Sequence, residues 1–163
     1  MISLYTMSSI YHGLRPDGMA KKVFQVIDHC SIFFLIAGTY TPITLCTVRE
    51  ANPVLGWTIF GIVWGMAILG CILNSIDLKK FKKFSMICYL GMGWCIVVAA
   101  KPMIEILKPG ALWLLLAGGI AYTVGAIFYG CGKRAKYMHS VFQLFVVAGS
   151  ILHFLCIALY ILK

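Results

Sequence analysis

Three ionisable residues, His12, Asp28 and His139, lie at the ends of apolar segments, where a membrane-embedded chain normally avoids such residues. An ionisable group at membrane depth is costly, and it is usually retained because it binds or reacts with something. Two imidazoles and one carboxylate that face one another form a ligand set suited to zinc. The sequence therefore predicts a metal site, provided that the helices bring these three residues together.

Composition places the chain in a membrane. Of its 163 residues, 61% are hydrophobic and 12% are charged, and the mean hydropathy is +0.93, whereas about a quarter of the residues of a soluble domain are charged. The 14 Lys and Arg residues outnumber the 5 Asp and Glu residues, but they gather in short segments between apolar runs, so we expect membrane lipids and no nucleic acid as partners. We predict an all-α, polytopic transmembrane helix bundle that forms one domain over residues 1–163.

Five apolar runs approach the ~20 residues that a helix needs to cross a bilayer. They cover residues 30–47, 55–76, 85–100, 111–130 and 141–162. A sixth run, residues 2–14, rises only ~20 Å as a helix, short of the ~30 Å hydrocarbon core. It lacks the basic region and the small-residue cleavage site of a signal peptide. We interpret it as the second half of a helix whose beginning is missing, so we expect five full helices and a partial first one.

Loop charges predict the orientation. Ten of the 14 basic residues lie in the first, third and fifth loops, within residues 15–22, 79–83 and 133–136, and the other four are Arg49, Lys101, Lys108 and Lys163. The positive-inside rule then places these three loops in the cytoplasm and the C-terminus outside, in a multi-pass protein of the cell membrane. The predicted metal ligands all lie at the cytoplasmic ends of their segments.

The cysteines and glycines have structural interpretations. The 7 cysteines form no Cys-x-x-Cys pair, so we expect free thiols that act as small hydrophobic side chains. The glycines lack the Gly-x-Gly-x-x-Gly spacing of a phosphate-binding loop and suit close approach of helices. These glycines are Gly61 and Gly65, and the set Gly118, Gly119 and Gly125.

Other polar residues also have alternatives. Asp28 alone could be an ordinary helix N-cap, a role compatible with a part in metal binding. His12 or His139 alone could be an interfacial amphipathic side chain. His153 lies some ~21 Å along the axis from His139, too far for the same metal, which leaves hydrogen bonding inside the bundle or a pocket role. His29 points about 100° away from Asp28 on a helix, so we expect it to stand apart from the site.

Four ordered motifs carry a resemblance to a known family. They are SSIYH at residues 8–12, IDHCSIFFLIAGTYTP at residues 27–42, GGIAYTVGAIFY at residues 118–129, and His139 in the last segment. Together they resemble the bacterial hemolysin III proteins of the progestin and adiponectin receptor (PAQR) superfamily, over essentially the whole chain. Members have seven helices, which implies that this copy lacks the first helix and the start of the second.

The resemblance also implies roles for individual residues. Members pair a Ser-x-x-x-His motif with an Asp and a His-x-x-x-His motif, in which the three histidines bind zinc and the Asp acts through a water. Ser8, His12, Asp28 and His139 match these positions, but Gln143 stands where the family has its third histidine. A neutral amide is a much poorer zinc ligand than imidazole, so a weakened zinc site is expected.

Three functions follow from these residues. The first is a zinc-dependent, ceramidase-like hydrolase of lipid amides or esters, with Asp28 as general base and Ser8 as oxyanion donor. The second, suggested by the family name, is a cytolysin or pore former, although the helices show no continuous polar stripe. The third is a non-catalytic protein of membrane-lipid homeostasis or a receptor-like protein, in which the metal only fixes three helices.

Overall fold

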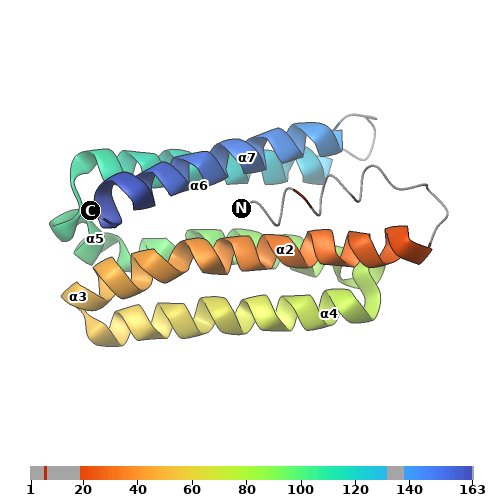
Figure 1. Ribbon diagram of the computed structural model, residues 1–163, viewed down its shortest axis with the longest axis horizontal. Coiled ribbons are helices and arrows are strands. Elements are labelled where there is room, and N and C mark those ends of the chain that lie inside the picture. The colour runs from red at the N-terminus through yellow and green to blue at the C-terminus, as the bar shows by residue number, and fades with distance from the viewer. Residues whose placement is uncertain (1–5, 7–18, 132–137, 163) are drawn as a thin grey trace.

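The computed structural model describes residue 6, residues 19–131 and residues 138–162, and within these residues every regular element is helical (Figure 1). The main helices are α2 (Met19–Ile43), α3 (Arg49–Ala51), α4 (Pro53–Trp94), α5 (Ala100–Ile106), α6 (Pro109–Cys131) and α7 (Met138–Cys156). Short π-helical turns (Thr44–Val48 and Ile157–Ile161) and a 3-10 turn (Cys95–Ala99) join or extend them. The predicted all-α fold class is confirmed.

Five stretches of these helices are long and apolar enough to cross a membrane. They are Lys22–Ala51, Pro53–Leu78, Lys83–Ile106, Pro109–Phe128 and Val141–Ile161. Each overlaps one of the five predicted runs, whereas the sixth run, residues 2–14, lies outside the described residues except for residue 6. Large apolar side chains on the outer faces are more than two thirds exposed, as hydrocarbon permits, for example Val54, Ile76, Ile87, Trp113 and Leu144.

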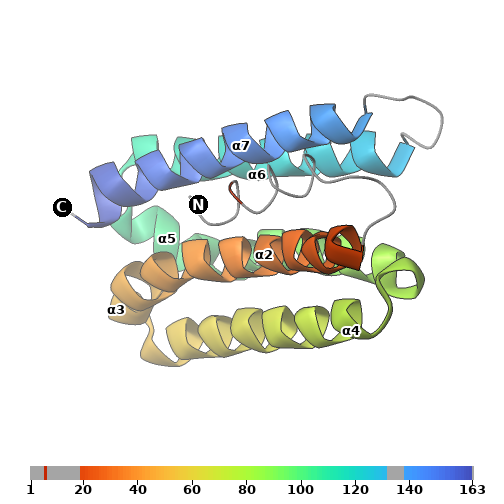
Figure 2. The same cartoon turned by 45° about the vertical axis from the view of Figure 1, so that its right-hand side comes forward.

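The helices pack as two groups. α6 packs most closely against α7, and α2 packs most closely against α4, whose second half lies behind α2 in both views (Figures 1 and 2). The start of α2, the middle of α4, the end of α6 and the start of α7 share one end of the bundle, while α3, α5 and the C-terminus lie at the other (Figure 1). The predicted alternation of loops between the two ends is therefore present in the fold.

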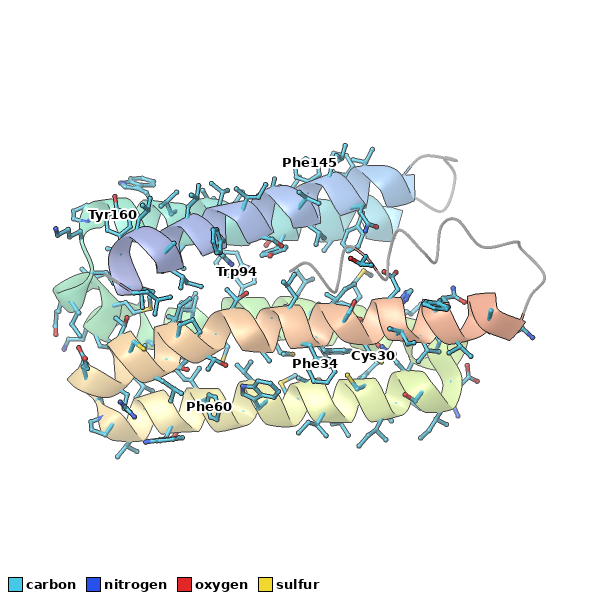
Figure 3. The ribbon with its side chains drawn as sticks, in the orientation of Figure 1. Cys30, Phe34, Phe60, Trp94, Phe145 and Tyr160 are labelled. Carbon is cyan, nitrogen blue, oxygen red and sulfur yellow. The ribbon has the colours of Figure 1, made fainter. Side chains whose placement is uncertain are left out.

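Close contacts hold α2 against the first half of α4. The Cys30 thiol donates to the Cys71 carbonyl at 3.8 Å, and the Cys71 thiol donates to the Cys30 carbonyl at 3.7 Å. The ring of Phe34 meets Trp64 edge-on with centroids 6.2 Å apart, and Figure 3 shows Cys30 and Phe34 on the side of α2 that faces α4. The cysteines of the described part are all free thiols, as expected.

Helix α2 begins earlier than expected. It starts at Met19, nine residues before Asp28, so the interpretation of Asp28 as a helix N-cap is wrong. The preceding residues, MAKKVFQVI, contain no Gly or Pro and are mostly good helix formers, so they continue the helix toward the basic end. Asp28 therefore lies inside a helix, with its backbone groups already paired.

Polar side chains cap α4 at its start and at the break inside it. Asn52 precedes Pro53 and its side chain accepts a hydrogen bond from the Leu55 N–H at 3.1 Å, a typical helix start. Asp77 has extended backbone angles inside α4, and its carboxylate accepts from the Lys80 N–H at 3.0 Å. The predicted third loop is thus a sharp, capped break between two membrane spans, and the exposed Asp77 is its cap.

Glycines set the contact between α6 and α7. Gly118 faces the ring of His153, and a Cβ atom at this position would overlap that ring, while a Cβ atom at Gly149 would lie 3.1 Å from the Gly118 carbonyl oxygen. Close approach is therefore confirmed for Gly118. It is also confirmed for Gly125, where an added Cβ atom would lie 2.8 Å from the Cβ atom of Phe145. It is wrong for Gly119, and for Gly61 and Gly65 on the outer face of α4, because no atom lies within 4 Å of an added Cβ atom at these three positions.

We expect Gly118→Ala to lower the free energy of unfolding in detergent by about 1–3 kcal/mol, because the added methyl group overpacks the His153 ring. Gly119→Ala is the matched control, since no atom lies within 4 Å of the position of its added Cβ and alanine suits a helix better than glycine. Thermal unfolding of both variants measures the difference. Equal stability of the two variants would contradict this account of the α6–α7 contact.

Candidate functional site

A cavity lies between the two helix groups. It has a volume of about 100 Å³, and its described lining residues come from α2, the second half of α4, α6 and α7. Most of these residues are apolar, such as Ile32, Met86 and Val146, but Asp28 from α2 and Gln143 from α7 both line it. The structure therefore brings two of the predicted site residues, 115 positions apart in sequence, to one cavity.

Asp28 is the most unusual residue of this cavity. It is only 6% exposed, and its backbone carbonyl accepts a hydrogen bond from the Ser31 hydroxyl at 2.7 Å. Within residues 19–131 and 138–162, no hydrogen bond or ion pair reaches its carboxylate. A carboxylate buried in an apolar environment needs a proton, a donor or a cation. Its place in the cavity therefore marks a point that favours a positively charged partner.

The other predicted ligands are described only in part. His139 belongs to α7, one helical turn before Gln143, which places the two residues on one face of that helix. The side chain of His139, and Ser8 and His12 as a whole, lie outside the described residues. No group of three or more His, Cys, Asp or Glu side chains that could hold a metal occurs within the described part. The shared zinc site of His12, Asp28 and His139 stays a prediction.

Sequence reasoning missed a buried polar pair beside Asp28. Ser85 lines the same cavity, and its hydroxyl donates to the Asn74 side-chain oxygen at 2.6 Å. The two residues are 2% and 1% exposed, respectively, and the Asn74 amide nitrogen has no partner in the described part of the chain. They lie on either side of the break at Asp77. Polar residues on both sides of a predicted turn were the feature of the sequence that could have indicated this pair.

The two remaining histidines lie along the same cavity. His153 bonds the Leu115 carbonyl through its Nε2 at 3.2 Å, which confirms the expected hydrogen bond inside the bundle. It also lines the cavity, while a role in binding a substrate stays a prediction. His29 bonds the Gln25 carbonyl through its Nδ1 at 2.9 Å. It lines the cavity as well, so the expectation that it stands apart from the site is wrong.

Five apolar helical spans around an inner cavity that contains a buried carboxylate define a multi-pass membrane protein with a polar site inside its bundle. The chain belongs to the hemolysin III family, since the family described as "Haemolysin-III related" matches residues 1–154. The resemblance seen in the sequence motifs is thereby confirmed.

Individual relatives agree with this assignment. The chain is 43% identical to "Hemolysin-3" of Bacillus cereus over 99% of its own length and 72% of that protein. It is 37% identical to "Hemolysin-3 homolog" of Bacillus subtilis over 100% of its length and 74% of that protein. A more distant relative, the human "Monocyte to macrophage differentiation factor", is 24% identical over 100% of this chain and 68% of that protein. No solved structure matches the chain significantly.

Proposed function

We propose that this hemolysin III protein holds zinc at the basic end of its bundle and hydrolyses an amide or ester bond of a membrane lipid. The observation that carries the proposal is the placement of Asp28 and Gln143 in one cavity. His139 lies one turn from Gln143 on α7, and the Asp28 carboxylate, which lacks a described partner, suits a cation. These residues fit a zinc site to which His12 contributes the second imidazole.

Each residue has a defined task in this proposal. His12 and His139 would hold the zinc, with Gln143 beside them and Asp28 acting through water, and the metal would supply Lewis-acid activation of the carbonyl and of the water. Asp28 would accept a hydrogen bond from the attacking water, take its proton onto a carboxylate oxygen, and pass that proton to the leaving amine or alcohol as its bond to the carbonyl carbon breaks. Ser8 donates to the carbonyl oxygen of the substrate. The apolar lining accepts the lipid chains and keeps bulk water from the bond that is broken.

The proposed orientation puts this site on the cytoplasmic side. Lys22, Lys80 and Lys83 are exposed at the end of the bundle where α2 begins and α4 turns, and this end also holds Asp28. The positive-inside rule assigns such an end to the cytoplasm. A lipid of the cytoplasmic leaflet would therefore reach the site first.

A hydrolase suits the cavity better than a pore does, although the relatives carry the name hemolysin. A water-filled pore needs a continuous polar path across the bundle. Apolar side chains such as Ile32, Leu35 and Leu90 line the cavity between the Asp28 end and the hydroxyl groups that lie deeper. The cavity therefore offers space for hydrocarbon chains more readily than for a column of water or ions.

Asp28→Asn should lower zinc-dependent lipid hydrolysis by at least about a hundredfold, because an amide cannot take the proton from water. The measurement is fatty-acid release from lipid amides and esters by purified protein in detergent, before and after zinc is removed by a chelator. Glu105→Gln, at an exposed residue of α5, is the control with the same chemical change. Full activity of the Asp28 variant would overturn the role of Asp28 as general base.

Gln143→His should tighten zinc binding by at least about tenfold, or about 1.4 kcal/mol, because it restores an imidazole one turn from His139. Competition against a chromogenic zinc chelator measures the change without any need for turnover. Leu144→His is the control, because Leu144 is 69% exposed on the outer face of α7. If the Gln143 variant binds zinc no more tightly than the parent, position 143 does not face a metal.

Lys80→Cys and Glu105→Cys, two exposed positions at opposite ends of the bundle, test the orientation. A membrane-impermeant maleimide added to intact cells should label position 105 and should reach position 80 only after permeabilisation. The parent chain supplies the background from its native cysteines. Labelling of position 80 in intact cells would show that the chain has the opposite orientation in the membrane.

A further inference from the structure

A second set of polar groups lies deeper in the bundle than Asp28. Thr39, Tyr40 and His153 line the cavity that contains Asp28, and they also line a neighbouring cavity. Thr39 follows Asp28 by eleven residues on α2, which corresponds to ~16 Å along the helix axis. The junction of the two cavities is therefore separate from the candidate metal site.

Thr39 at the junction and Thr123, which lines only the cavity that contains Asp28, have already used their hydroxyl hydrogens. Thr39 donates to the Leu35 carbonyl at 2.8 Å, and Thr123 donates to the Gly119 carbonyl at 2.8 Å. Thr123 also accepts a hydrogen bond from the Trp94 indole at 3.0 Å. A hydroxyl has one hydrogen and two lone pairs, so each threonine has only acceptor capacity left for a ligand.

The larger side chains show the same pattern. Tyr40 donates its phenolic hydrogen to the Gly93 carbonyl at 2.7 Å and accepts from the Ile96 N–H at 3.1 Å. The Nε2 of His153 bonds the Leu115 carbonyl at 3.2 Å, which places the hydrogen of a neutral ring on Nε2 and leaves Nδ1 as an acceptor. The Thr39 hydroxyl and the His153 ring therefore keep acceptor capacity for a ligand, whereas the Tyr40 phenol already donates one hydrogen bond and accepts another.

The neighbouring cavity provides room for a hydrocarbon chain. It has a volume of about 500 Å³, and it extends from the junction toward α5 and the start of α6. Its lining is largely apolar and includes Ile43, Val97, Met103, Leu112 and Leu116. A molecule that fills it is thus apolar over most of its length, and its polar end meets acceptors only.

We propose that the junction of Thr39, Tyr40 and His153 binds the head of a single-chain lipid that donates hydrogen bonds, such as a hydroxyl or amino group, with its tail in the apolar cavity. Head groups that only accept hydrogen bonds, such as ethers, or that carry negative charge, such as carboxylates, are disfavoured because Thr39, Tyr40 and the Nε2 of His153 already bond carbonyl groups of the protein. The site requires no metal. It can therefore be tested independently of the proposed zinc-dependent function.

The test compares two ligands that differ only in the donor. Hexadecanol has a hydroxyl hydrogen, whereas its methyl ether keeps the oxygen and the chain but cannot donate. Equilibrium binding of both radiolabelled molecules is measured with the purified full chain in detergent, in the presence of a chelator that removes zinc. We expect hexadecanol to bind at least about threefold more tightly, the effect of one net hydrogen bond.

Thr39→Val then locates the donor contact. The change keeps the shape of the side chain, and the lost bond to Leu35 lies within α2, so the fold is retained. It should lower hexadecanol affinity by about threefold and leave the affinity for the ether unchanged. Thr58→Val is the control, because the Thr58 hydroxyl also bonds its own helix, at the Val54 carbonyl, but lies on the exposed surface.

Only one pattern supports the proposal: the alcohol binds more tightly than the ether, and Thr39→Val, but not Thr58→Val, removes the difference. Equal binding of alcohol and ether overturns it, as does the absence of binding by either. Equal losses for both ligands in Thr39→Val show a packing effect and overturn it as well. A loss of zinc binding would change none of these readings, since the chelator is present throughout.

Discussion

Every backbone N–H and C=O group of a membrane-spanning chain must find a partner within the protein, because hydrocarbon offers none. Continuous helix meets this requirement, and the informative places are those where the helix is interrupted. Asn52 and Asp77 supply side-chain acceptors at two such places. At a third, inside the bundle, the Tyr40 phenol from another helix bonds both the Gly93 carbonyl and the Ile96 N–H where α4 changes to a 3-10 turn. The tertiary packing thus completes the backbone of a neighbouring helix.

The same requirement shapes the chemistry of the cavity. Polar side chains in hydrocarbon save free energy by giving their hydrogens to nearby carbonyls, as Thr39 and Thr123 do within their own helices. What remains exposed to the cavity is a set of lone pairs. Asp28 adds a carboxylate, which accepts when ionised. A cavity whose hydroxyl groups already donate to backbone carbonyls favours ligands that donate hydrogen bonds or carry positive charge.

Hydropathy predicted the five spans because each helix that crosses a bilayer needs a long run of predominantly apolar residues, wherever it lies in the sequence. Details that depend on contacts between helices were less accessible. Asp28 resembled a helix start because the apolar run begins just after it, yet the helix extends two turns further toward the basic end. Gly61 and Gly118 look alike in the sequence, but only Gly118 faces another helix. Ser85 and Asn74 escaped notice because the break at Asp77 folds the chain back and pairs residues that no helical period connects. Family motifs, rather than spacing, singled out Gln143, and the structure places it in the lining of the cavity that Asp28 also lines.

The separation of the two polar levels constrains any lipid that occupies the bundle. Asp28 and Thr39 lie ~16 Å apart along α2, and apolar residues such as Ile32 and Leu35 fill the interval. A head group bound at one level therefore places hydrocarbon, not polar atoms, in the interval, since a polar group there would find few partners. The exposed Lys22 and Lys80 lie at the end of the bundle that also holds Asp28, so their positive charges act more strongly on the outer level than on the more distant inner one. The two levels therefore differ in chemistry as well as in depth: the outer one contains a buried carboxylate, and the inner one contains a hydroxyl, a phenol and an imidazole.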